Sequence, residues 1–503
     1  MNQPRPAPPL ARRRLLAAVA LLLLAGCRGE TPEDPPLKIA TLEGQGDAIV
    51  ADSISAGLTA RDARGAVIPG IAQSWRVSDD GLSLVFRLRD ARFADGRVIT
   101  ATDAAASVRR VLKVPPAGYR GLVAGIRSVS APVANVVEVT LTTPQPEVLE
   151  LLAEPAFAIR PGGHARSYAG PFVQVAVEKP APGHVRLQRQ PTFHAVAEVQ
   201  LAAVEIIADS APDAAIARFR NREADIVTGG GLTGMGAARA LGEPNALRLQ
   251  TSRAALMLLV NQRSGPLADR RVRTALSMAI DRNRLGPLLF GSAAAQPVAG
   301  ISPPTARSGG ASVEPDWIAL PMEQRLTDAR RLLTEAGHGP EAPLKLVVSA
   351  TDQSGDERLV TMVGEDLARI GVSLTLGRRS PRAHAAAVAR GAFELALVER
   401  STPIASPVPF LVALGCGNNR HGVCLAEADR LLAESWKAGS TSERLAMLAS
   451  AERLWAEDAA VIGLVQPLRW SLVSERVGGW SASASPVHPL RFLSFDPDRK
   501  LLK

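Results

Sequence analysis

The chain has 503 residues, of which 46% are hydrophobic and 21% charged, a composition typical of a globular protein and not of a disordered or multi-span membrane chain. This length is too great for one ordinary core and predicts two or three lobes. The formal charge of +9 falls to +5 without residues 1–26, which hold four arginines and no acid, because 54 basic and 49 acidic residues then remain. No block of Lys and Arg marks a nucleic-acid tail, so we expect no nucleic-acid partner.

The first 27 residues have the pattern of an export signal. Arginines at positions 12–14 precede an apolar run over residues 15–25, which is shorter than the roughly 20 residues that a membrane-spanning helix needs. Residues 24–27 read Leu-Ala-Gly-Cys, which resembles the lipobox of bacterial lipoproteins and implies cleavage before Cys27 and acylation of its thiol. The alternative is an ordinary signal peptide with a chance cysteine. We expect a signal peptide over 1–26, a tether over 27–37, and a lipid anchor at the periplasmic face of a bacterial membrane.

Local signals in the first half of the body predict a hairpin and a helix. The hairpin spans residues 75–89, because Asp80-Gly81 is a strong two-residue turn signal between alternating apolar positions. Thr100 and Asp103 have the spacing of a capping box and predict the start of an amphipathic helix.

Strands and helices alternate in the second half. Strand patterns cover residues 255–260, 344–349, 372–376 and 393–398. Helical patterns start at Asp269 and cover residues 322–336, 359–370, 425–436 and 442–457. This alternation predicts an α/β lobe with a partly parallel sheet.

Cysteine and histidine placement bears on disulfides, metals and catalysis. Cys416 and Cys424 are the only cysteines after Cys27, and in an exported protein they favour a disulfide that closes a small loop, with two free thiols as the alternative. We expect no metal site there, because His421 is the one further ligand nearby and structural zinc needs four. Neither His-Glu-x-x-His nor Gly-x-Ser-x-Gly occurs, so we expect a protein that is not an enzyme and holds no cofactor.

Many short segments resemble one family in order and spacing. Residues 68–81 read Ile-Pro-Gly-Ile-Ala-Gln-Ser-Trp-Arg-Val-Ser-Asp-Asp-Gly, residues 93–96 read Phe-Ala-Asp-Gly, residues 279–282 read Ala-Ile-Asp-Arg and residues 476–480 read Arg-Val-Gly-Gly-Trp. These segments are similar to the family-5 extracellular solute-binding proteins, which include dipeptide, oligopeptide and nickel receptors of ABC importers. The resemblance runs from about residue 38 to about residue 498.

The resemblance implies an α/β, two-lobed periplasmic-binding-protein fold of type II, with an enlarged first lobe, a hinge and an interlobe cleft. Residues 38–258 and 468–503 would form lobe I, with a sub-domain at about 55–160, and residues 259–467 would form lobe II. A small solute, peptide-like or neutral to anionic, would close the lobes and pass to ABC permease subunits. We expect a monomer with a lipid anchor as its membrane contact. The alternative is a sensor or interaction protein on the same fold.

The expected solute contacts depart from those of peptide-binding members of the family. In those members, the strand matched to residues 393–397 leads to an aspartate that pairs with the peptide ammonium group. A gap-free alignment places Pro403 and Ser406 at the two aspartate positions and Arg400 at a tryptophan. A desolvated ammonium without a carboxylate would cost several kcal/mol, so we expect a neutral or anionic solute facing Arg400 and Ser401. Glu399 is an alternative partner for a cation, and Arg400 could instead pair with Glu399 or a surface acid.

Two further segments are candidates for the cleft wall. Gly229 and Gly230 follow a strand pattern and would allow close approach of a solute to the backbone. Arg469 and Trp470 follow the expected second hinge crossing and could line the cleft.

Overall fold

A computed structural model describes residues 35–42, 44–162, 168–177, 182–263, 265–307, 313–417 and 421–496. The expected signal peptide, Cys27 and most of the tether lie outside the described residues, as do residues 497–503. The chain divides into two units, residues 1–36 and 37–503, and the fold below is that of the second unit.

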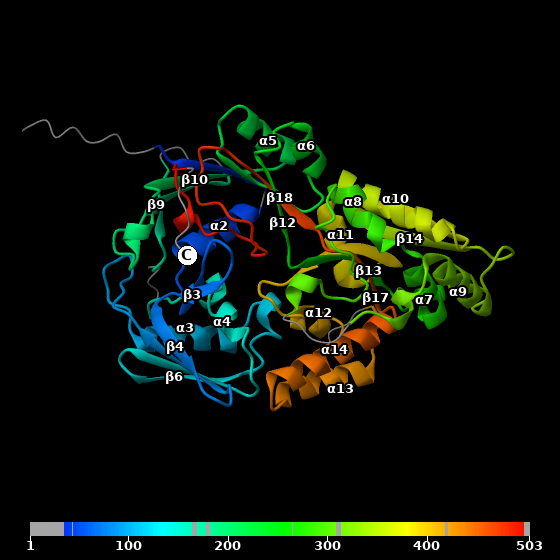
Figure 1. The fold of residues 1–503 in the computed structure, drawn as a ribbon, viewed down its shortest axis with the longest axis horizontal. Coiled ribbons are helices and arrows are strands. Elements are labelled where there is room, and N and C mark those ends of the chain that lie inside the picture. Colours follow the sequence, from blue (N-terminus) through cyan, green and yellow to red (C-terminus); the bar gives the residue numbers. More distant parts are fainter. Residues whose placement is uncertain are drawn as a thin grey trace, which may run out of the picture. The chain divides into compact units, whose positions relative to one another are not determined.

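The first sheet combines strands from both ends of the chain, which Figure 1 shows in blue and red. It has seven strands, in the order β12-β18-β11-β1-β10-β9-β8. Their bounds are β1 Leu37–Leu42, β8 Phe172–Val175, β9 His184–Arg189, β10 Ala203–Asp209, β11 Ile226–Thr228, β12 Leu247–Thr251 and β18 Leu468–Val473. Strand β1 runs parallel to β10 and β11, whereas β18 is antiparallel to both of its neighbours. Three helices connect strands of this sheet along the sequence: α2 Gln45–Ile54 follows β1, α5 Pro212–Arg220 follows β10, and α6 Met235–Ala240 follows β11.

The sub-domain at residues 55–160 has a four-stranded antiparallel sheet of its own, in the order β4-β5-β7-β6. Its elements are β2 Thr59–Arg61, β3 Val67–Pro69, β4 Ala72–Val77, β5 Ser83–Leu88, α3 Ala101–Lys113, β6 Ile126–Val133, β7 Val136–Leu141 and α4 Val148–Leu151. The predicted hairpin is confirmed as β4 and β5, with Gly81 at a φ of 69° in the turn. The predicted capping box is confirmed as well, because Thr100 accepts from the Asp103 amide and the Asp103 carboxylate accepts from the Thr100 amide.

The second sheet has five strands in the order β15-β14-β16-β13-β17. Their bounds are β13 Ala254–Val260, β14 Leu344–Thr351, β15 Val372–Arg379, β16 Leu395–Ser401 and β17 Val461–Val465. The helices around it are α7 Arg270–Ala279, α8 Arg282–Phe290, α9 Met322–Glu335, α10 Ser354–Ala368, α11 Pro381–Arg390, α12 Val408–Val412, α13 Ala426–Glu434 and α14 Thr441–Glu457. Strand β14 is parallel to β15 and β16, and β13 is antiparallel to β16 and β17, so the partly parallel sheet is confirmed.

The chain passes between the two large sheets twice. Strand β13 pairs with β16 along its whole length, so the expected boundary at 258/259 falls inside a strand of the second sheet and moves to the Ser252-Arg253 step between β12 and β13. Strand β18 starts at Leu468 and belongs to the first sheet, so the second crossing lies at Gln466-Pro467. The two crossings are bonded to each other, because the Ser252 hydroxyl donates to the Pro467 carbonyl (2.6 Å) and the Gln466 amide donates to the Ser252 carbonyl (2.5 Å).

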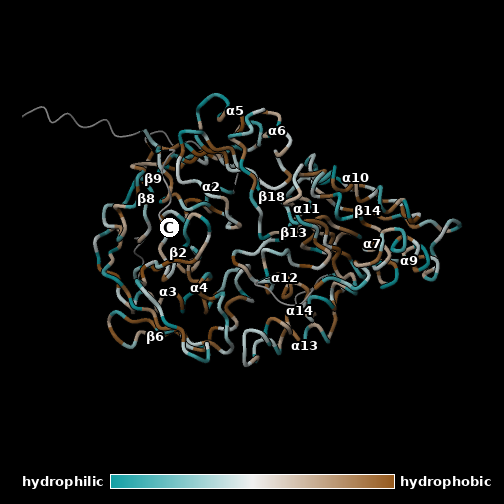
Figure 2. The backbone as a smooth tube through the Cα atoms, in the orientation of Figure 1, coloured by the Kyte–Doolittle hydropathy of each residue, from teal (hydrophilic) through white to brown (hydrophobic). Residues whose placement is uncertain are grey.

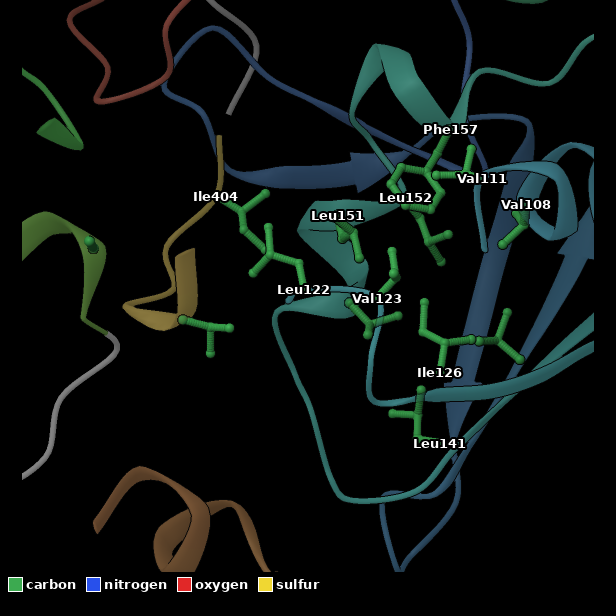
Figure 3. Packing of buried hydrophobic residues seen from close by; sticks show 14 of the residues in the cluster. Val108, Val111, Leu122, Val123, Ile126, Leu141, Leu151, Leu152, Phe157 and Ile404 are labelled. Atoms are coloured by element: carbon green, nitrogen blue, oxygen red, sulfur yellow. The ribbon is translucent and has the colours of Figure 1, made fainter. Parts of the chain in front are cut away.

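Hydrophobic stretches of the chain, brown in Figure 2, run through both large sheets. Every residue of β13 is buried, and the strand lies between β16 and β17. One hydrophobic cluster contains side chains from the sub-domain, the second sheet and helices α12 to α14. Figure 3 shows Ile404, from the segment after β16, beside Leu122 and Leu151 of the sub-domain. The sub-domain and the second sheet therefore share one core.

The expected disulfide between Cys416 and Cys424 is present, with the two Cα atoms 4.5 Å apart. Over the described ranges, no helix is both long and apolar enough to cross a membrane. The same ranges hold no group of three or more acidic, His or Cys side chains arranged to bind a metal ion.

Candidate functional site

The candidate site centres on the second half of β16, where one edge of the strand is open. Strand β13 pairs with all of β16, but on the other side β14 pairs only with Leu395 and Ala396. Beside the open edge, Nε2 of His384 lies 2.9 Å from the carbonyl oxygen of Leu397, and Nδ1 lies 3.0 Å from the Ser349 hydroxyl. Because a carbonyl oxygen only accepts, His384 donates from Nε2 and is held in place by both bonds.

Two cavities meet at this edge. The first, of about 370 Å³, is lined by β1, α2, residues 229–231, β18 and the segment 480–493. The second, of about 650 Å³, is lined by residues 231–233, the end of β14, α10, α11 and β16. Gly231 and Glu399 line both cavities, so they mark the place where the first sheet faces the second.

Glu399 is the charged group at this junction. A Cβ atom at Gly231 would lie 3.1 Å from Oε2 of Glu399, so only a glycine leaves this carboxylate its full space. The side chain is accessible to water, yet protein surrounds the cavity that it faces. The surrounding protein displaces part of the bulk water near the carboxylate and so raises the pKa of Glu399, the charge of Arg469 opposes the rise and the charge of Asp356 adds to it.

Arg400 and Ser401 have different surroundings. Arg400 and its neighbour Glu399 both line the second cavity, but no ion pair joins them. Arg400 is half-buried on the wall of the second cavity, and burial alone lowers the pKa of its guanidinium. Ser401 is exposed at the end of β16, pairs with Ala254 and lines neither cavity.

Of the four candidate site residues on the side of the first sheet, three line the first cavity and one does not. Gly229, Gly230 and Arg469 line the first cavity, and Arg469 also donates to the Pro486 carbonyl (3.3 Å). Trp470 lies in the core and not on the cavity wall: it is fully buried, and its indole N–H donates to the Thr233 carbonyl (2.9 Å). The alternation along β18 explains the difference, because adjacent side chains point to opposite faces of the sheet.

The positions aligned with the family's aspartates lie away from both cavities. The Pro403 carbonyl accepts from Arg253 (3.0 Å) and Arg61 (3.4 Å), and Ser406 is buried. Arg253 also forms an ion pair with Glu150 of the sub-domain (2.6 Å). This segment therefore joins the sub-domain to the second sheet.

Sequence reasoning missed several residues that line the cavities. Asp356 of α10 lines the second cavity and accepts a hydrogen bond from Thr351 (2.5 Å). In the first cavity, the rings of Trp480 and His488 stack at 4.6 Å, and burial lowers the pKa of His488 to about 4. These side chains come from segments far apart in the sequence, so no local motif identifies them.

Two α/β sheets joined by two crossings, with cavities where the sheets face each other, define a periplasmic-binding-protein fold of type II. The profile of the "Bacterial extracellular solute-binding proteins, family 5 Middle" matches residues 66–421. The chain belongs to family 5 of the bacterial extracellular solute-binding proteins.

Two curated proteins are similar in sequence to this chain over most of their length. The periplasmic oligopeptide-binding protein OppA of Salmonella typhimurium is 24% identical over 475 residues, covering 88% of this chain and 86% of OppA. Di/tripeptide-binding protein 2 of Pseudomonas aeruginosa is 27% identical over 471 residues, covering 83% of this chain and 84% of its own.

Solved structures share the fold. The murein tripeptide binding protein MppA of Escherichia coli has a TM-score of 0.75 at 21% identity, covering 91% of this chain and 98% of MppA. Haemophilus influenzae OppA in complex with the peptide RPPGFSPFR has a TM-score of 0.74 at 19% identity, covering 92% and 99%. The chain is thus an extracytoplasmic solute-binding receptor, and its relatives are periplasmic.

Proposed function

We propose that this receptor captures a small peptide-like solute between its two sheets and delivers it to the permease of an ABC importer, without catalysing a reaction. The carrying observation is the open edge of β16, beside Glu399 and at the junction of the two cavities. Main-chain N–H and C=O groups at such an edge pair with an extended amide-containing solute, as in β-strand addition. The relatives that bind oligopeptides and di- or tripeptides support this solute class.

A solute in the junction would contact both sheets at once. Gly231 and Arg469 belong to the first sheet's side, and Glu399 and Arg400 belong to the second. Since only the closed arrangement offers both sets of contacts, binding shifts the population toward it. The crossings at Ser252 and Gln466 would be the hinge.

Native mass spectrometry of protein purified from its own periplasm, without refolding, tests this function. We expect a co-purified small molecule with amide groups, and a rise in melting temperature when it is added back to the stripped protein. A protein that purifies empty and shows no thermal shift with di- and tripeptides would contradict import of a peptide-like solute and favour the sensor or interaction role.

We also propose that Cys27 carries the lipid anchor of a monomeric receptor, on the strength of the Leu-Ala-Gly-Cys segment alone. Cys27→Ser removes the thiol that would be acylated. We expect the wild type in the membrane fraction with incorporated radiolabelled palmitate, and the variant unlabelled and either uncleaved or released. Equal palmitate labelling of both would exclude acylation at Cys27.

A further inference from the structure

A third, smaller cavity lies at the junction of the sub-domain and the first sheet. The sub-domain contributes β2 and Pro155 to its wall, and the side of the first sheet contributes the end of α2, His194 and residues 489–491. Its volume is about 60 Å³. Since one water needs about 10–15 Å³ of such space, this cavity has room for a few waters or for one small ion.

Arg491 lines this third cavity without a protein partner for its charge. The residue is only 7% exposed, yet within the described part of the chain its guanidinium makes no hydrogen bond and has no carboxylate within 4 Å. Its close contact is the ring of Phe492, with the centroid at 4.5 Å. By contrast, the buried Arg273 and Arg444 each have a carboxylate oxygen at 2.7 Å, and the buried Arg282 donates to several backbone carbonyls. A buried charge without such partners is costly, which indicates that a counter-ion from outside the chain completes the site.

The acids around Arg491 do not supply this counter-ion. Asp52 of α2 lines the same cavity, but the two side chains form no ion pair. Burial raises the pKa of Asp52 more strongly than the charges of Arg61 and Arg491 lower it, which shifts this carboxyl group toward its neutral form. Glu198 and Asp62 also favour the charged form of Arg491, but burial outweighs them and lowers the pKa of the guanidinium.

The other titratable groups on the wall leave Arg491 as the uncompensated charge. Arg61 of β2 also lines the third cavity, but its own charge is met by Glu150 (3.7 Å). His194 is neutral at physiological pH, because burial lowers its pKa to about 3 and the charges of Arg89 and Arg491 lower it as well. The cavity therefore presents one free guanidinium to whatever occupies it.

We propose that the third cavity binds a small oxyanion, of the size of formate, sulfate or phosphate, which pairs with Arg491. A guanidinium binds oxyanions through paired, directional hydrogen bonds, so it suits this ligand class. The site is separate from the solute cavities and goes beyond the proposed function. Leu490 lines both the third cavity and the first. The bound anion therefore holds residues 489–491 in place from behind the wall of the first cavity.

Thermal unfolding of the purified protein tests the site, with formate, sulfate and phosphate added separately at an ionic strength kept constant with HEPES, which is too bulky for the cavity. We expect a saturable rise in melting temperature with at least one of the three anions. Arg491→Met should abolish the rise, and Arg491→Lys, which keeps the charge but loses the fork, should weaken the apparent affinity at least about 10-fold. Arg476→Met is the matched control, because Arg476 also lies over an aromatic ring (Phe495, 4.7 Å) but has Asp225 as its partner. It should keep the full rise. No saturable rise with any of the anions, or an equal rise in Arg491→Met, would overturn the proposal.

Two further measurements establish the sign and the place of the bound charge. Asp52→Asn removes the acid from the wall and should preserve or enlarge the anion-dependent rise, whereas loss of the rise in this variant would show that the cavity needs the carboxylate and takes a cation. Crystals grown with selenate, a sulfate analogue that scatters anomalously, should show a peak beside Arg491 in the third cavity. An empty cavity at a selenate concentration that saturates the melting shift would place the anion elsewhere and overturn the site.

Discussion

Gly229 and Gly230 are adjacent on the wall of the first cavity, but their surroundings differ sharply. A Cβ atom at Gly229 would lie 2.0 Å from Cε2 of Trp470, whose indole is fully buried and hydrogen-bonded. A Cβ atom at Gly230 would have Thr233 as its nearest neighbour, at an ordinary 3.8 Å. The first glycine is therefore required by packing, although both were predicted only as places where a solute comes close.

We predict that Gly229→Ala destabilises the protein by about 1–3 kcal/mol, because the extra methyl group forces the indole or the strand to move. Gly230→Ala is the matched control and should change stability by less than about 0.5 kcal/mol. Urea unfolding followed by tryptophan fluorescence measures both. Equal unfolding midpoints for the two variants would show that Trp470 is not held rigidly against Gly229.

At the scale of elements, sequence reasoning succeeded where the signal is local. The Asp80-Gly81 turn, the Thr100 cap and the Cys416–Cys424 disulfide each depend on residues within a short segment, and all three are present. Helix α8 was missed, because Gly286 and Pro287 interrupt its pattern. The sheet to which β13 belongs could not be derived either, since a strand that is apolar on both faces carries no periodicity that assigns it to one lobe.

The part of the candidate site that lies close to local sequence signals could be predicted, and the rest could not. Glu399, Arg400 and Arg469 lie next to recognisable family segments, and the structure places all three on cavity walls. Asp356 was missed because its role depends on α10 facing the open edge of β16, a long-range relation that no spacing encodes. The exposure of Arg469 and the burial of Trp470 depend on which face of β18 meets the cavity, which alternation alone does not decide.

At the scale of the whole molecule, a buried ion pair joins the sub-domain to the far end of the chain. Arg444 of α14 is fully buried, and its Nη1 lies 2.7 Å from Oε1 of Glu147, which precedes α4. The guanidinium also lies over the ring of Trp436, at 4.9 Å from its centroid. Together with the Arg253–Glu150 pair and the shared core, this contact couples the sub-domain to the second sheet.

We predict that Glu147→Gln destabilises the protein by about 3–5 kcal/mol, because it leaves the Arg444 charge buried without a partner. The double variant Glu147→Leu with Arg444→Met should cost much less, since neither charge remains. The control is Glu434→Gln, which breaks an exposed pair with Arg430 (2.7 Å) and should cost less than about 1 kcal/mol. Urea unfolding midpoints compare the three, and equal losses in the single and double variants would contradict this account of the interface.

The position of β18 governs when the first sheet can be completed. This strand lies between β11 and β12, so the sheet that starts with residue 37 has a gap in its interior until residues 468–473 have emerged from the ribosome. Pairings of such sequence separation form slowly, because a long loop must close before they contribute. A nascent chain thus has no finished first sheet during most of its synthesis, and the first cavity, which Arg469 and Ser471 of β18 line, is complete only after this last strand has crossed.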